Sequence, residues 1–181
     1  VPATIYVEIF RGTPMLLQLF FAYFALPSIG INLSPMAAGV LTLGLCVGAY
    51  LSEVFRAAIQ AVDRGQWEAS SALAMSWPMT MRYTILPQAV RIALPSTGKY
   101  AIALFKDSAL ASTVSVVELL FSAQILAAQT FQYVKIYIIV GIFYFLICYP
   151  TSIAMGLLEK KLDITRKRSK PPAAAAVAAS N

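Results

Sequence analysis

An uncharged run of 41 residues, positions 12–52, constrains the fold more than any other feature of the sequence. A turn-rich patch of proline, glycine and asparagine at positions 27–35 divides it into two apolar pieces. Each piece alone is shorter than the roughly 20 residues that a membrane-spanning helix needs. The first piece can extend back through Val7 and Ile9, and the second can continue towards Val62. We therefore expect two spanning helices joined by a short loop.

A second uncharged stretch, positions 136–158, is 23 residues long. At about 1.5 Å per residue it is long enough to cross a bilayer as one helix. Pro150 is expected to kink this helix, which membranes tolerate because neighbouring groups satisfy the freed carbonyl. Positions 85–134 are apolar but interrupted by prolines and charges, and one span near positions 101–117 followed by an amphipathic piece fits them best. The expected fold class is all-α, a polytopic membrane bundle of about four transmembrane helices within positions 1–162.

The composition supports a membrane protein and narrows its chemistry. Hydrophobic residues make up 59% of the chain and charged residues 12%, whereas a soluble domain carries roughly 25% charged residues. Histidine is absent, which removes most zinc sites and the commonest general base, so we expect no metal and no cofactor. Cys46 and Cys148 lie inside apolar runs, where a thiol behaves as a small hydrophobe rather than as a disulfide partner.

Basic residues indicate the orientation. If the spans alternate, the arginines up to Arg91 and the basic cluster at positions 160–170 fall on one side of the membrane. The positive-inside rule then places positions 64–91 and the C-terminus in the cytoplasm, with the chain starting inside. A basic tail also suits nucleic acid or anionic lipid. Directly after a span we interpret it as an orientation signal and expect no nucleic-acid partner. Positions 163–181, basic and then low in complexity, are expected to form a disordered tail.

Positions 63–89, between the second and third spans, form the most informative segment. Gly65 is expected to end the preceding helix as a C-cap, and positions 66–76 to form a short helix rich in alanine and serine. Pro78 suits the first turn of another helix, which Pro87 ends or bends. The segment is therefore expected to be a helix–turn–helix exposed to the cytoplasm.

Small side chains along this short helix permit close seating in the groove of a partner. The large side chains Trp67, Met75 and Trp77 offer anchors that supply binding energy. These features are typical of a docking element. The alternative is an amphipathic loop that lies on the membrane surface, with its tryptophans among the lipid headgroups.

The same segment resembles the cytoplasmic EAA loop of permease subunits of binding-protein-dependent ABC transporters. That pattern begins with Glu-Ala-Ala, continues with glycine after three further residues, and closes with Ile-x-Leu-Pro. Glu68, Ala69 and Ser70 match its start, and Leu86 and Pro87 match its end without a gap.

Two positions depart from the pattern: Ala74 stands where glycine is usual, and Thr84 stands at the isoleucine position. Alanine for glycine is a mild change, so the docking role is retained. The runs FRGTPMLLQLFF, GAYLSEVFRAAIQAV, GQWEAS, LPQAVRIALP and LFKDSALAS are similar to signature runs of the polar amino acid branch of this family. The similarity covers about positions 6–162. Family members usually carry one further helix before FRGTP, so we expect the chain to lack its first helix.

The resemblance implies a permease subunit that forms the translocation path for an amino acid and couples to a separate cytoplasmic ATPase. Binding of ATP needs a phosphate-cradling GxxxxGK[ST] loop, which the sequence lacks, so we expect no enzyme activity of this chain. The implied partners are an ABC ATPase, an extracytoplasmic amino-acid-binding protein, a second permease subunit, identical or different, and the bilayer of the bacterial cytoplasmic membrane. The residues implied to dock the ATPase are Gly65, Trp67, Glu68, Ala69, Ser70, Ala72, Ala74, Leu86 and Pro87.

Charges at membrane depth are costly unless they line protein or a water-filled path. Lys106 and Asp107 are therefore candidates for the substrate path, with Glu53 as a further candidate. Adjacent residues point about 100° apart on a helix, so Lys106 and Asp107 are expected to serve different tasks. Arg56 follows Glu53 by one helical turn, so a structural pair explains Glu53 equally well. The alternatives to transport are a membrane-embedded enzyme that uses such carboxylates and a scaffold without a substrate path.

Overall fold

The computed structural model describes residues 2–162, and these contain no strand. The tail expected at positions 163–181 lies outside the described residues. The helices, in chain order, are α1 (Pro2–Gly12), α2 (Met15–Phe20), the π-helical η1 (Phe21–Ala25), the 3-10 helix η2 (Leu26–Ile29), α3 (Pro35–Gln60), α4 (Arg64–Ala72), α5 (Trp77–Met79), the π-helical η3 (Thr80–Ile85), α6 (Leu86–Asp107), the 3-10 helix η4 (Ser108–Val114), α7 (Leu119–Thr130) and α8 (Tyr133–Leu162).

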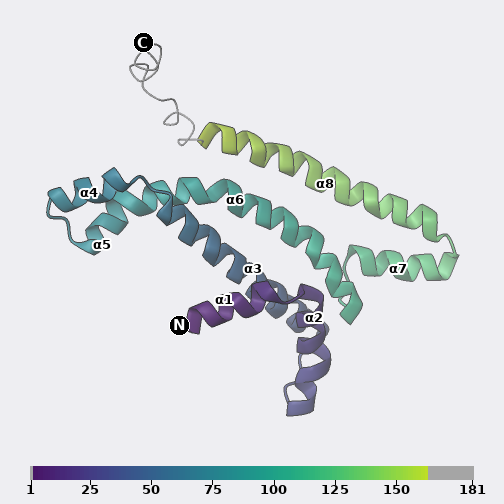
Figure 1. Ribbon diagram of the computed structural model, residues 1–181. Coiled ribbons are helices and arrows are strands. Elements are labelled where there is room, and N and C mark those ends of the chain that lie inside the picture. The colour runs from purple at the N-terminus through teal and green to yellow at the C-terminus, as the bar shows by residue number, and fades with distance from the viewer. Residues whose placement is uncertain (1, 163–181) are drawn as a thin grey trace, which may run out of the picture.

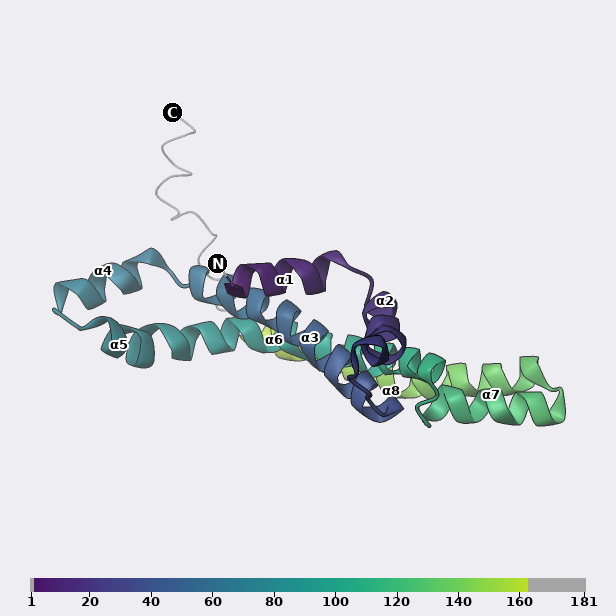
Figure 2. The ribbon, with the colours of Figure 1, turned by 90° about the horizontal axis from the view of Figure 1, so that it is seen from below.

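Three long helices form the body of the molecule. Helix α6 lies between α3 and α8 and contacts both, while α4 and α5 lie at one end and α7 at the other (Figure 1). Seen from below, α1 lies alongside α3, and α4 lies over the segment that leads into α6 (Figure 2). The short helices are thus placed at the ends and on one side of a three-helix layer.

Among the described residues, α3 and α8 are long and apolar enough to cross a membrane by length and composition. Two bent pairs would raise the number of spans to four: α1 with the segment from α2 to η2, and the segment from α5 to η4 with α7. The predicted all-helical membrane fold is confirmed. The described residues thus give between two and four spans, and the expected number of about four equals the upper limit.

Helix α3 begins after the turn-rich patch, as the sequence predicts. Ser34 Oγ accepts a hydrogen bond from the backbone N–H of Ala37 at 3.2 Å, which caps the first turn. Pro35 occupies the start of the helix, where its missing N–H costs nothing. Ala38 and Ala49 are completely buried, because small side chains on this face let neighbouring helices approach closely.

The first expected span is not one helix. The helices on either side of Thr13 and Pro14 are bent by 106°, at a point that we call the elbow (residues 12–15). Pro14 is extended, with ψ 133°, and it has no N–H to continue a helix. The side chain of Gln18 holds the turn, because its Nε2 lies 2.9 Å from the carbonyl oxygen of Phe10 and 2.8 Å from Thr13 Oγ1.

The third expected span also differs from the prediction. Helix α6 begins at Leu86 rather than near position 101, and it passes into η4 after Asp107. Helix α7, predicted as an amphipathic piece, has no distinct polar face. The carboxylate of Glu118 caps α7 by accepting from two backbone N–H groups of its first turn, at 2.9 and 2.6 Å. This cap fixes the start of the hairpin that α7 forms with α8.

Helix α8 agrees with the predicted span and continues through Pro150. It crosses α6 closely at Gly98, where an added Cβ would collide with the side chain of Met155. Near this crossing Lys99 Nζ and Glu159 Oε2 form an ion pair at 2.7 Å. Most large apolar side chains of α8 are exposed, as expected for a helix that faces lipid or another membrane subunit.

Some of the buried apolar residues form two small clusters. One joins α3 to η3 and α6 beneath α4, and its members are Ala58, Val62, Ile85, Ala89 and Ala93. The other lies where α2 meets η4 and the turn that follows it, and its members are Leu19, Ala111, Val114 and Val116. The first cluster supports α4, and the second supports the segment that follows the elbow.

Candidate functional site

Helix α4 starts with an aspartate cap. The Asp63 Oδ1 atom accepts from the backbone N–H of Gly65 at 2.8 Å, which satisfies a free donor of the first turn. The prediction that Gly65 ends the preceding helix is therefore wrong: α3 has its C-cap at Ala61, and Gly65 lies inside α4.

Helix α4 ends in a left-handed turn at Ala74, which has φ 51°. The backbone N–H of Met75 donates to the carbonyl of Ser70 at 3.1 Å, and that of Ala74 donates to Ser71 at 2.9 Å. These two bonds make a Schellman motif, which favours glycine at the left-handed position. This backbone conformation gives a physical reason for the glycine in the EAA pattern, and alanine adopts it here with strain.

The two faces of α4 differ in exposure. Ser70 is buried at 3% exposure, and Trp67 packs partly buried against the cluster around Ile85. Trp67 therefore anchors α4 to the body of the protein and does not point outward. Leu73 and Trp77 are 75% and 69% exposed and present apolar surface next to α4.

The remaining residues predicted to dock a partner lie on the surface of the segment. Gly65, Glu68, Ala69, Ala72, Ala74, Leu86 and Pro87 are all exposed. Glu68 pairs with Arg64 along its own helix, at 3.3 Å, and both side chains are largely exposed. The helical backbone passes through Pro87 into α6 instead of ending there, with the π-helical η3 before it. Pro78 stands in the first turn of α5, as predicted.

A cavity of about 490 Å³ lies where the elbow meets α3 and α6. Its lining residues are Arg11, Gly12, Thr13, Pro14 and Met15 at the elbow, Cys46, Val47 and Tyr50 on α3, and Tyr100, Ala103, Leu104, Asp107 and Leu110 on α6 and η4. The lining is mainly apolar with a few polar groups, which is the usual character of a small-molecule site.

Two opposite charges and two tyrosines line this cavity. The rings of Tyr50 and Tyr100 stack with centroids 5.5 Å apart, and the guanidinium carbon of Arg11 lies 5.7 Å from the centroid of Tyr50. Asp107 lines the cavity from α6, and its role in a substrate path stays a prediction. Lys106 is exposed and does not line this cavity, so the two neighbours have different surroundings.

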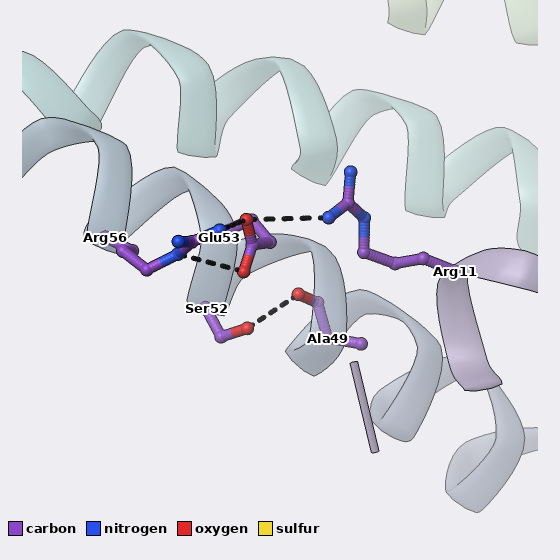
Figure 3. Close-up of polar contacts among 5 residues, drawn as sticks. All are labelled: Arg11, Ala49, Ser52, Glu53 and Arg56. Atoms are coloured by element: carbon purple, nitrogen blue, oxygen red, sulfur yellow. Dashed lines mark hydrogen bonds and ion pairs between the residues drawn. The ribbon is translucent and has the colours of Figure 1, made fainter. Parts of the chain in front are cut away.

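Glu53 contacts two arginines (Figure 3), and one of them, Arg11, lines the cavity. Both of its carboxylate oxygens accept from Arg56 on the same helix, with 3.2 Å between Arg56 Nε and Oε1. Arg11 Nη1 reaches Oε2 from α1 at 3.5 Å. The structural pair with Arg56 that the spacing suggested is therefore present. Glu53 is linked to the cavity lining through Arg11.

Arg11 is the residue that sequence reasoning missed. In the charge pattern, Arg11 counts only as one of the basic residues that indicate the orientation of the chain in the membrane. It stands immediately before the elbow, in the run FRGTP. The signal that points to it is the conjunction of an arginine with a Gly-Thr-Pro turn inside an apolar segment. Its contacts to Tyr50 and Glu53 bridge about 40 positions of sequence and follow from no local pattern.

Comparison with known proteins gives related sequences over most of the chain. The probable amino-acid ABC transporter permease protein YckA of Bacillus subtilis is 42% identical over 160 residues, 88% of this chain and 71% of the relative. The L-cystine transport system permease protein TcyB of the same species is 39% identical over 161 residues, 88% of this chain and 69% of the relative. The putative glutamine transport system permease protein GlnP of Rickettsia bellii is 41% identical, covering 90% and 75%.

A solved structure agrees with these relatives. A crystal structure of an amino acid ABC transporter with histidines superimposes with a TM-score of 0.83 at 39% identity, over 87% of this chain and 74% of that chain. The model of the family described as binding-protein-dependent transport system inner membrane component matches residues 2–164. The chain therefore belongs to the family of binding-protein-dependent transport system inner membrane components, which confirms the resemblance seen in the sequence.

Proposed function

We propose that this chain is the permease subunit of an ABC-type amino acid importer, that it forms the translocation path, and that it couples this path to a cytoplasmic ATPase. One observation carries the proposal. The cavity between the elbow, α3 and α6 is lined by one cation, one carboxylate and two tyrosines, and the chain that contains it belongs to a family of transport system membrane components. The relatives are named as amino acid, cystine and glutamine permeases, which supports transport over an embedded enzyme or a scaffold.

The chemistry of the cavity suits an amino acid. Its volume of about 490 Å³ lies in the range of small-molecule sites. Arg11 offers charge-assisted donors to the substrate carboxylate, and Asp107 offers an acceptor to its ammonium group. Tyr50 and Tyr100 supply aromatic surface to the same lining. Glu53 acts on this site through Arg11, and Lys106 is the weaker candidate because it lies outside the lining.

The exposed surface of α4 and the turn after it are the proposed docking site for the ATPase. Small side chains at Ala69 and Ala72 permit close seating, and Leu73 and Trp77 provide apolar anchors beside them. Glu68 stands at the solvent side of the same helix. A lobe of the ATPase that grips this surface would move α4 as a rigid body when it closes.

The remaining partners follow from the same proposal. An extracytoplasmic binding protein delivers the amino acid, and a second permease subunit, identical or different, completes the path. The chain resides in the cytoplasmic membrane of a bacterium, with α4 and the C-terminus on the cytoplasmic side. The exposed apolar side chains of α8 support contact with lipid or with that second subunit.

The decisive experiment compares two adjacent substitutions in the complete transporter in proteoliposomes. Asp107→Asn removes the carboxylate of the cavity, and Lys106→Met removes a charge of the neighbouring exposed residue. Loss of one charged hydrogen bond predicts an apparent affinity about tenfold weaker for Asp107→Asn. Lys106→Met should keep the wild-type affinity. Uptake of labelled amino acids, measured against concentration, decides the question. Equal affinities for wild type and Asp107→Asn would remove this cavity from the path.

A further inference from the structure

Polar side chains tie α4 to the segment that leads into α6. Gln88 Nε2 donates to Gln66 Oε1 at 3.1 Å and to the backbone carbonyl of Thr84 at 2.9 Å. Ser70 Oγ lies 3.3 Å from Thr84 Oγ1 and 2.8 Å from the carbonyl of Gln66. Gln66, Thr84 and Gln88 are partly buried and Ser70 is buried, so these contacts are partly shielded from water. We refer to these four residues as the clasp.

The amide of Gln88 has a fixed orientation. The carbonyl of Thr84 only accepts hydrogen bonds, so the Gln88 side chain must direct its NH₂ group towards it. The same NH₂ group faces Gln66, which must then present its oxygen. A residue without an acceptor at position 66 cannot make this bond, and Gln88 cannot flip to compensate without losing its bond to Thr84.

The clasp supplies directional hydrogen bonds to a contact that is otherwise apolar. Trp67 packs against the cluster around Ile85, and such packing resists separation but permits sliding. Both ends of α4 are turns, with its cap at Asp63 and a left-handed residue at Ala74. The Gln66–Gln88 bond therefore defines how α4 sits on the start of α6.

Helix α6 leads from the clasp to the cavity. Gln88 lies in its first turn, and Tyr100 and Asp107 line the cavity from its later turns. The helix has 22 residues and is therefore about 33 Å long. If α6 moves together with α4, the residues of α6 that line the cavity move as well.

We propose that the amide pair of Gln66 and Gln88 is the positioning contact that makes α4 and α6 move as one body. This inference rests on the proposed function, in which the ATPase grips α4. Neither residue needs to touch the ATPase or the substrate. The two residues determine how much of the movement of α4 is transmitted to α6.

The test uses pairs of side chains of equal length. Gln66→Glu keeps an acceptor at position 66, whereas Gln66→Met removes it. Gln88→Met removes the amide at position 88 and serves as a second, independent loss variant. The membrane yield of each variant is compared with wild type, so that loss of folding is recognised.

The first readout needs no ATPase. Spin labels at Ser71→Cys and Arg91→Cys, both exposed positions, report the distance between α4 and α6 in a Cys46→Ala, Cys148→Ala background. Wild type and Gln66→Glu should give one narrow distance distribution. Gln66→Met and Gln88→Met should enlarge a displaced population about fivefold, as loss of one neutral hydrogen bond predicts.

The second readout is the number of amino acids imported per ATP in the assembled transporter. It should fall in Gln66→Met and Gln88→Met, with the ATPase still bound, and stay near wild type in Gln66→Glu. Identical distance distributions in Gln66→Met and Gln66→Glu would overturn the clasp. Failure of the ATPase to bind the wild-type chain would instead contradict the proposed docking site, and the distance measurement would still test the clasp.

Discussion

Arg11 and Glu53 form an ion pair between α1 and α3, with 3.5 Å between Nη1 and Oε2 (Figure 3). Arg56 already engages both oxygens of Glu53, so Arg11 is the second cation on one carboxylate. A guanidinium has five N–H donors, and this contact uses a small part of them. Arg11 therefore has donors left for a carboxylate in the cavity that it lines.

Arg11→Met should weaken the apparent affinity for the transported amino acid about tenfold, because a charged hydrogen bond to its carboxylate is lost. Arg56→Met is the matched control, since it removes the other cation from Glu53 without changing the cavity lining. Concentration-dependent uptake in proteoliposomes measures both. If the two variants lost affinity to the same extent, the effect would arise from Glu53 and not from contact with substrate.

Ala74→Gly should raise the melting temperature of the purified protein. Ala74 has φ 51°, a conformation that costs a residue with a Cβ about 1 kcal/mol and costs glycine little. Ala69→Gly, inside α4, should lower it, because glycine is about 1 kcal/mol worse than alanine in a helix interior. Thermal unfolding in detergent checks both signs. A lower melting temperature for Ala74→Gly would contradict the strain at this position.

The sequence was sufficient for α3 and α8 and insufficient for the elbow and for the start of α6. Helix α8 follows from an uncharged stretch long enough to span a bilayer, and α3 follows from a Ser-Pro start and an apolar run. A proline inside an apolar run is compatible with a kink or with a sharp turn. The bonds from Gln18 to Phe10 and Thr13 stabilise the sharp turn, and a hydropathy pattern does not contain them.

The candidate sites, too, could be predicted from the sequence only in part. A local motif predicted α4 and its exposed small residues, but it did not give the inward direction of Trp67 or the outward direction of Leu73. Those directions depend on the cap at Asp63 and the left-handed turn at Ala74, which set where the helix begins and ends. The place of Asp107 in the lining could be proposed from its depth in an apolar segment. The place of Arg11 in the lining could not be predicted, because it depends on the sharp bend at the elbow, which follows α1.

Ala72→Trp should prevent the ATPase from seating on α4 while leaving the permease folded. Ala72 is exposed, so a bulky side chain has room within the chain but occupies the surface that a partner must approach. Ala128→Trp places the same bulk at an exposed position of α7, at the opposite end of the molecule (Figure 1), and should have no effect on the ATPase. Copurification of the ATPase with each variant is the measurement. Equal recovery of ATPase with both variants would place its binding surface elsewhere.

The orientation can be tested with single cysteines in a background that carries Cys46→Ala and Cys148→Ala. Ser71 is exposed on α4 and Ser28 is exposed in η2, so both positions are accessible within the chain to a thiol reagent. Ser28→Cys should react with a membrane-impermeant maleimide in intact cells, because the uncharged turn after α2 is proposed to face outward. Ser71→Cys should react only after the cells are permeabilised, since Arg64 in α4 and the arginines before and after it in the sequence favour the cytoplasmic side. Reaction of Ser71→Cys in intact cells would reverse the orientation and exclude a cytoplasmic ATPase as the partner of α4.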